Sequence, residues 1–150
     1  AGIALVFVRP PSGCRASGAT RFVTPGRAIL IQSFRYLSDD QFWFTFFHEI
    51  GHLVIHGKDS TFIETDEAAK SVREAEANAF AANTLIPLTR ASELASLKSD
   101  KMSIIRFAVS IGVAPGLVVG QMQHSGIIVY NQLNFLKRRY LRDQIDSILA

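Results

Sequence analysis

The chain contains the pentapeptide His48-Glu49-Ile50-Gly51-His52, which reads HEIGH. Two histidines four positions apart lie on one face of an α-helix, about a turn apart, so both imidazoles can reach a single metal ion. The glutamate between them is displaced around the helix, where its carboxylate can act on water at the metal instead of binding the metal. The motif therefore predicts a zinc-hydrolase site with His48 and His52 as ligands and Glu49 as general base.

Catalytic zinc usually has three protein ligands and one open position, so a third ligand must come from elsewhere. His56 continues the four-residue spacing. However, His56 lies about 12 Å along the helix axis from His48, too far for both rings to bind one ion at about 2 Å. We expect His56 outside the ligand set, near the helix C-terminus, where the helix dipole favours histidine.

The better source of a third ligand is the alanine-rich run over residues 73–83. Its composition has strong helix propensity, and its small residues allow close packing against the HEIGH helix. Glu74 and Glu76 lie about 200° apart around such a helix, so only one of them can face the metal. Glu76 shares a mostly apolar face with Phe80, whereas Glu74 shares a face with Lys70. We choose Glu76 as the third ligand and keep Glu74 as the alternative.

The HEIGH motif lies in a predicted helix over residues 39–56. Ser38 and Gln41 fit a capping box at its start, and two aspartates in the first turn complement the helix dipole. The helix is apolar around most of its circumference, so we expect it to be buried. Buried polar groups cost free energy unless they are paired or bind a metal. Core histidines that donate to backbone carbonyls are the alternative interpretation.

The remaining elements predict an α+β fold, a small N-terminal sheet followed by a helical bundle. Strands are expected over residues 3–8, 20–23 and 28–33, the last two as a hairpin. Either hairpin strand could offer an open edge to an extended substrate, although ordinary pairing is an equal alternative. Further helices are expected over residues 67–85, 88–97, 102–111, 115–124 and 133–149.

Composition fits one compact domain spanning residues 1–150, with a net charge of +3 that does not by itself indicate nucleic acid. Cys14 is the only cysteine, which excludes a disulfide framework and a thiolate zinc site. The apolar segment at residues 3–8 is too short to insert into a membrane, and no signal peptide is visible.

Two segments together resemble the ImmA/IrrE-type metallopeptidases of bacteria and phages. They are FTFFHEIGHLVIHG at residues 44–57 and EAEANAFAANTLIP at residues 74–87. In that family HExxH is followed by Glu-Ala-Asn-x-Phe-Ala, here residues 76–81, and by Leu-x-Pro, here residues 85–87. Residues 111–124 also look like members of the group, so the resemblance covers nearly the whole chain.

The resemblance implies a zincin-like fold and a cytoplasmic zinc peptidase, with His48, His52 and Glu76 as Zn²⁺ ligands and Glu49 as base. It implies a protein substrate, namely a helix-turn-helix transcriptional repressor whose cleavage releases mobile-element or stress-response genes. Many members also carry their own N-terminal helix-turn-helix domain. This chain begins at Ala1 in an apolar strand without one, so we expect it to be a domain of a longer protein.

Several alternatives stay open. A metal-binding regulator or antitoxin-like module would bind a partner protein or DNA without cutting, although the intact set of motif residues argues against it. Residues 108–118 have helix-turn-helix spacing, but the following helix over residues 115–124 has no Arg or Lys, so direct DNA binding is disfavoured. A basic cluster at residues 137–139 is expected on a solvated helix face. A His-His-Glu site also accepts manganese, cobalt or iron.

Overall fold

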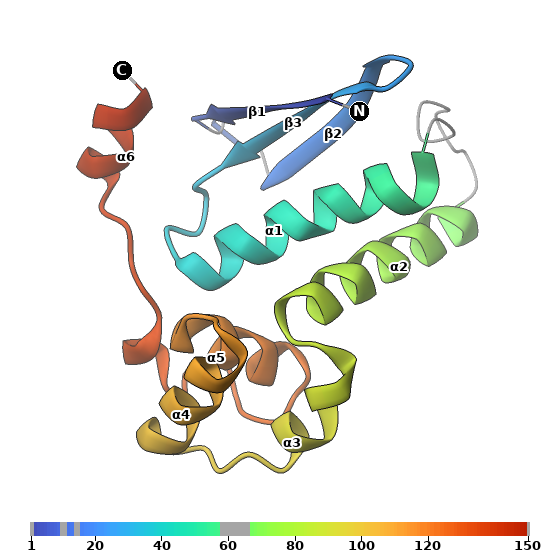
Figure 1. The fold of residues 1–150 in the computed structure, drawn as a ribbon. Coiled ribbons are helices and arrows are strands. Elements are labelled where there is room, and N and C mark those ends of the chain that lie inside the picture. The colour runs from blue at the N-terminus through green and yellow to red at the C-terminus, as the bar shows by residue number, and fades with distance from the viewer. Residues whose placement is uncertain (1, 10–11, 14–15, 58–66, 150) are drawn as a thin grey trace.

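A computed structural model describes residues 2–9, 12–13, 16–57 and 67–149. Cys14 lies outside the described residues. A small sheet packs on one side of helix α1 (Asp39–Gly51), and most of the later helices lie on the other side of α1 (Figure 1). The predicted α+β class is therefore confirmed.

The sheet has three strands in the order β1-β3-β2. β1 (Gly2–Val8) runs parallel to β3 (Arg27–Ser33), and β2 (Gly18–Thr24) runs antiparallel to β3, which confirms the predicted hairpin. Because β3 is paired on both sides, it has no free edge for a further strand. Of the two hairpin strands, only β2 is an edge strand of this sheet, and it lies beside α1.

The HEIGH helix is α1, which continues as a short π-helical segment, η1 (His52–His56). Helix α2 (Glu67–Leu85) has the predicted bounds and lies alongside α1 (Figure 1). A methyl group added at Gly51 would lie 3.2 Å from the Cα of Ala77 and 3.2 Å from the Cβ of Phe80. The two helices therefore pack almost backbone to backbone, because the residues between them are small.

Most of the remaining elements form a helical layer below α1 and α2 (Figure 1). These are η3 (Leu88–Arg90), α3 (Ala91–Ala95), α4 (Lys101–Ile111), α5 (Pro115–His124) and η4 (Asn134–Leu136). The C-terminal helix α6 (Arg142–Leu149) lies apart from this layer, beside the sheet, where Asp146 pairs with Arg9. Ile104, Val118 and Met122 are fully buried where α4 packs on α5. The Asp100 carboxylate caps α4 by accepting hydrogen bonds from the backbone N–H groups of Met102 and Ser103.

The predicted helix over residues 133–149 is wrong. Only η4 and α6 are helical in this region, and residues 137–141 between them run past the N-terminus of α1. Arg139 forms a β-bridge with Ser38, and the backbone N–H of Tyr140 donates to the carbonyl of Leu37 at 2.9 Å. These backbone hydrogen bonds to a distant segment replace those of a local helix.

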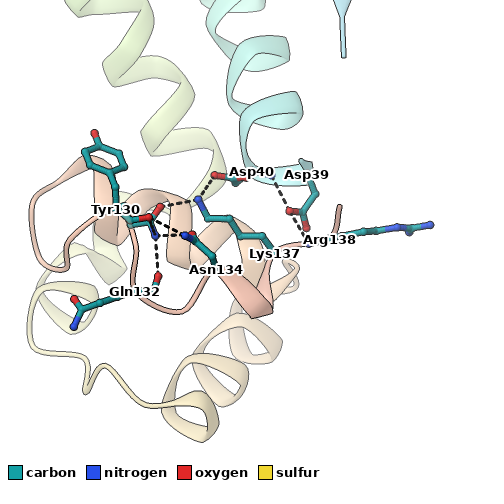
Figure 2. A network of polar contacts seen from close by, with 8 residues as sticks. Asp39, Asp40, Tyr130, Gln132, Asn134, Lys137 and Arg138 are labelled. Atoms are coloured by element: carbon teal, nitrogen blue, oxygen red, sulfur yellow. Dashed lines mark hydrogen bonds and ion pairs between the residues drawn. The ribbon is translucent and has the colours of Figure 1, made fainter. Parts of the chain in front are cut away.

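The capping box is also wrong. Ser38 occupies the N-cap position of α1, but its side chain makes no capping hydrogen bond. Asp39 and Asp40 are in the first turn as expected, yet both are buried against the C-terminal segment. The Asp39 carboxylate accepts from the backbone N–H of Arg138 at 3.1 Å (Figure 2). The two aspartates thus anchor a distant segment in addition to complementing the helix dipole.

Lys137 is buried, contrary to the expectation that the basic cluster is solvated. Its Nζ lies 2.7 Å from Asp40 Oδ2 and donates to Gln123 Oε1 at 2.6 Å (Figure 2). Both charged side chains are less than a tenth exposed. This ion pair joins α1, α5 and the C-terminal segment in one polar network.

Within the described residues, no single helix is both long and apolar enough to span a membrane. Helices α4 and α5 reach the required length and hydropathy only as a pair, and that pair is bent by 107°.

Replacing Lys137 with Met leaves the buried Asp40 carboxylate without its cation. We expect Lys137→Met to lower the free energy of unfolding by about 3–5 kcal/mol, as measured by urea denaturation. The control is Arg9→Met, which breaks the exposed Arg9–Asp146 pair at 2.9 Å and should cost less than about 1 kcal/mol. Equal losses in the two variants would contradict a special role for the buried pair.

Candidate metal centre

Three side chains converge where α1 and η1 face α2. The Nε2 atoms of His48 and His52 lie 3.0 Å apart. The Glu74 carboxylate places Oε2 at 3.3 Å from His48 Nε2 and Oε1 at 3.5 Å from His52 Nε2. Ligand atoms around a tetrahedral zinc ion with bonds of about 2.0 Å are about 3.3 Å apart. Two imidazoles and a carboxylate at these separations therefore fit a zinc ion in both chemistry and geometry.

The structure corrects the choice of third ligand, because Glu74 and not Glu76 lies with the two histidines. Ala77 and Ala81, three and seven residues after Glu74, have no exposed surface and mark the face of α2 that contacts α1. Glu76 lies about 100° around the helix from Ala77. Its carboxylate contacts His56 at 2.9 Å instead. The hydrophobicity of the two faces of α2 favours the face of Glu76, whereas the small size of Ala77 and Ala81 decides which face is buried.

Nδ1 of each of the two candidate histidine ligands also has a hydrogen-bond partner. His48 Nδ1 lies 2.9 Å from Asn78 Oδ1, one turn after Glu74 on α2. Because an amide oxygen can only accept, Nδ1 of His48 carries the hydrogen and Nε2 keeps its lone pair toward the cluster. His52 Nδ1 lies 3.3 Å from His56 Nδ1. His56 is outside the ligand group, as its distance along the helix predicts.

Burial, reinforced by the neighbouring His48, lowers the pKa of His52 below its ordinary value. A lowered pKa keeps the His52 imidazole neutral near pH 7, which is the form that binds metals. The local environment of this ring therefore favours its ligand state before any ion is added.

Glu49 is buried beside the cluster without joining it. Burial, together with the negative charge of Glu74, raises the pKa of Glu49 to about 7. A methyl group added at Gly18 of β2 would lie 2.8 Å from Glu49 Oε1 and 2.8 Å from Thr45 Cγ2. Glycine at this position therefore lets the edge strand pack directly over the Glu49 carboxylate. A carboxyl with a pKa near 7 can both accept and return a proton at neutral pH.

The cluster opens into a pocket of about 600 Å³ between β2, α1 and α2. The start of β2 contributes Gly18, Ala19 and Thr20 to its wall. Sequence reasoning missed Thr45 and Gln41, which line the pocket one and two turns before Glu49. Helical periodicity counted backwards from Glu49 would have found both. Tyr36, whose hydroxyl can donate a hydrogen bond, also lines this pocket.

Because the folded protein raises the pKa of Glu49, it binds that proton more tightly than the unfolded chain does. The stability from protonated Glu49 is thus present below the ordinary pKa of 4.5 and is lost as the pH rises through about 7. We expect metal-free Glu49→Gln to match wild type near pH 4.5 and to exceed its free energy of unfolding at pH 8 by up to about 3 kcal/mol. Urea unfolding in chelator at several pH values measures this difference.

The control for this experiment is Glu93→Gln, at an exposed carboxylate paired with Arg90. This variant should show no gain of stability at pH 8, since ionised Glu93 is not buried. A Glu49→Gln curve parallel to that of wild type at all pH values would show that Glu49 titrates normally.

A family model described as Peptidase_M78, IrrE N-terminal-like domain, matches residues 5–119. The match runs from β1 into α5 and includes all residues of the cluster and Glu49. A comparison with curated proteins gives no match.

Proposed function

We propose that this chain, which belongs to the Peptidase_M78 family of IrrE N-terminal-like domains, is a zinc-dependent endopeptidase that cleaves a protein substrate. Membership of the family makes it a metallopeptidase-like domain. The observation that carries the proposal is the set of three donor groups 3.0–3.5 Å apart with the buried Glu49 beside them. This combination provides both a metal site and a base, and hydrolysis of a peptide bond requires both.

In the proposed mechanism His48, His52 and Glu74 would hold the ion. A bound zinc ion supplies Lewis-acid chemistry, lowering the pKa of water and polarising a carbonyl oxygen. Glu49 takes a proton from the attacking water on its carboxylate and later gives it to the leaving amine. Burial under Gly18 keeps this carboxylate out of bulk solvent. The Tyr36 hydroxyl, on the pocket wall, is a candidate donor to the developing oxyanion.

The edge of β2 suggests how a peptide binds. β2 pairs with β3 on one side, and its first residues form the wall of the pocket next to Glu49. An extended substrate can add to this edge as a further strand, with main-chain hydrogen bonds that place its scissile bond beside the cluster. This mode requires an unfolded segment or flexible linker, which a repressor with separate domains contains between them. The resemblance to ImmA/IrrE-type metallopeptidases implies such a substrate, and on that ground we propose a helix-turn-helix transcriptional repressor.

DNA as a direct ligand is less well supported. The candidate recognition helix is α5, whose Gln121 and Gln123 are both buried in the structure. Of the polar side chains at its C-terminal end, His124 is exposed. A helix that buries its amides cannot present them to base edges.

The ligand set can be tested by zinc affinity, measured by competition with a chromophoric chelator. We expect Glu74→Ala to weaken zinc binding by about 100-fold or more, since it removes the anionic member of the group His48, His52 and Glu74. Asn83→Ala, at an exposed site nine residues further along α2, is the matched control and should bind like wild type. An unchanged zinc affinity for Glu74→Ala would remove this residue from the ligand set.

Catalysis can be tested with Glu49→Gln, which keeps the shape of the side chain but removes the base. We expect this variant to bind zinc and the repressor encoded beside its gene, and to cleave that repressor on the order of 10²–10⁴ times more slowly than wild type. Cleavage is followed by gel electrophoresis and mass spectrometry of the fragments. If wild type and variant both bind the repressor without cutting it, the chain is a metal-binding regulator and the peptidase proposal fails.

A further inference from the structure

We propose that Glu76 and His56 are positioning residues that fix the ring of His52 through a chain of hydrogen bonds. The chain runs from the Glu76 carboxylate through both nitrogens of His56 to Nδ1 of His52, and leaves Nε2 of His52 free to bind the metal. The inference rests on the metal site proposed above and adds two residues to it.

The direction of each hydrogen bond follows from the atoms involved. His56 Nε2 lies 2.9 Å from Glu76 Oε2, and an ionised carboxylate can only accept, so this nitrogen carries a hydrogen. A neutral imidazole has one N–H, so Nδ1 of His56 is an acceptor. His52 Nδ1, at 3.3 Å from it, must therefore be the donor. That assignment leaves the lone pair of His52 on Nε2, the atom 3.0 Å from His48 Nε2.

The position of His56 supports a specific role. Its side chain is only 6% exposed, although Glu76 is half exposed. A buried imidazole costs free energy unless its nitrogens find partners, and both nitrogens of His56 have them. The π-helical turn η1 begins at His52 and ends at His56, and brings these two rings to a centroid distance of 5.3 Å. π-Helical turns are rare and occur often at functional sites.

Helix α2 then controls all three candidate ligands. It supplies Glu74 directly, orients His48 through Asn78, and orients His52 through Glu76 and His56. The two histidines differ in the group that contacts Nδ1. The neutral amide of Asn78 contacts His48 directly, whereas the hydrogen-bond chain from His52 ends at the carboxylate of Glu76. A carboxylate behind a ligating histidine fixes its tautomer and raises its basicity. Glu76 would thus act on the metal site through two imidazoles.

The first experiment determines the histidine tautomers in the metal-free protein. Long-range ¹H–¹⁵N NMR spectra at pH 8, above the ordinary histidine pKa of about 6.5, distinguish Nδ1–H from Nε2–H. We expect His56 as the Nε2–H form and His52 as the Nδ1–H form in wild type and in Asn83→Ala. In Glu76→Ala we expect the two rings to become mixtures of tautomers. A dominant Nε2–H form of His52 in wild type would overturn the proposal.

The second experiment measures the zinc affinity of the variants. Glu76→Ala and His56→Phe should each weaken zinc binding by about 10–100-fold. His56→Gln should recover part of this loss, because its amide offers an acceptor and a donor in place of the two ring nitrogens. Asn83→Ala should bind as wild type does. Unchanged zinc affinity in Glu76→Ala and His56→Phe, or no difference between His56→Phe and His56→Gln, would contradict a positioning role.

The two readouts separate this proposal from the proposed function. Failure of wild type to bind zinc would end the metalloenzyme proposal, and the metal-free NMR spectra would still test the hydrogen-bond chain. If wild type binds zinc tightly and Glu76→Ala keeps the wild-type tautomers of His52 and His56, the positioning role fails but the metalloenzyme proposal stands. Circular dichroism tests whether each variant is folded. If His56→Phe does not fold, Glu76→Ala decides, since its side chain is half exposed.

Discussion

The close contact between α1 and α2 is the constraint on which the candidate site depends. Gly51, the glycine of HEIGH, faces the backbone of Ala77, and a methyl group added at Gly51 would lie 3.2 Å from the Ala77 Cα. At this separation short side chains from α2 can reach the histidines of α1. Glu74 and Asn78 flank Ala77 and therefore reach His48 and His52. Larger residues at the contact would move both groups out of range, even with every polar residue retained.

A second constraint comes from the C-terminal segment, which fixes the other end of α1. The buried pair of Asp40 and Lys137 ties the first turn of this helix to residues almost one hundred positions later. A buried ion pair is weak evidence of stability, but it is demanding in its geometry. It orients the start of α1 relative to α5, while α2 orients its end. The histidine-bearing helix is thus held at both termini by contacts that are distant in sequence.

Local patterns predicted most of the elements and the HEIGH residues, because amphipathic periodicity, turn residues and motif spacing are encoded over short distances. The errors all involve distant contacts. Glu76 was favoured for its apolar neighbours, but the buried face of α2 follows from the two alanines that fit against Gly51. The C-terminal helix was expected over residues 133–149 because its composition is helical. Backbone pairing with Ser38 and burial of Lys137 override that propensity.

The electrostatics of the cluster favour a cation. Burial and the negative charge of Glu74 raise the pKa of Glu49, so the two carboxylates repel each other across the pocket. Glu74 is about half exposed but Glu49 is buried, and a buried carboxylate beside a second carboxylate costs free energy unless a ligand offsets the repulsion. A dication between Glu74 and the histidines would remove the repulsion and leave Glu49 ionised, the state required of a base. The residues that make the metal-free site electrostatically unfavourable are therefore the ones that would favour an occupant of charge +2.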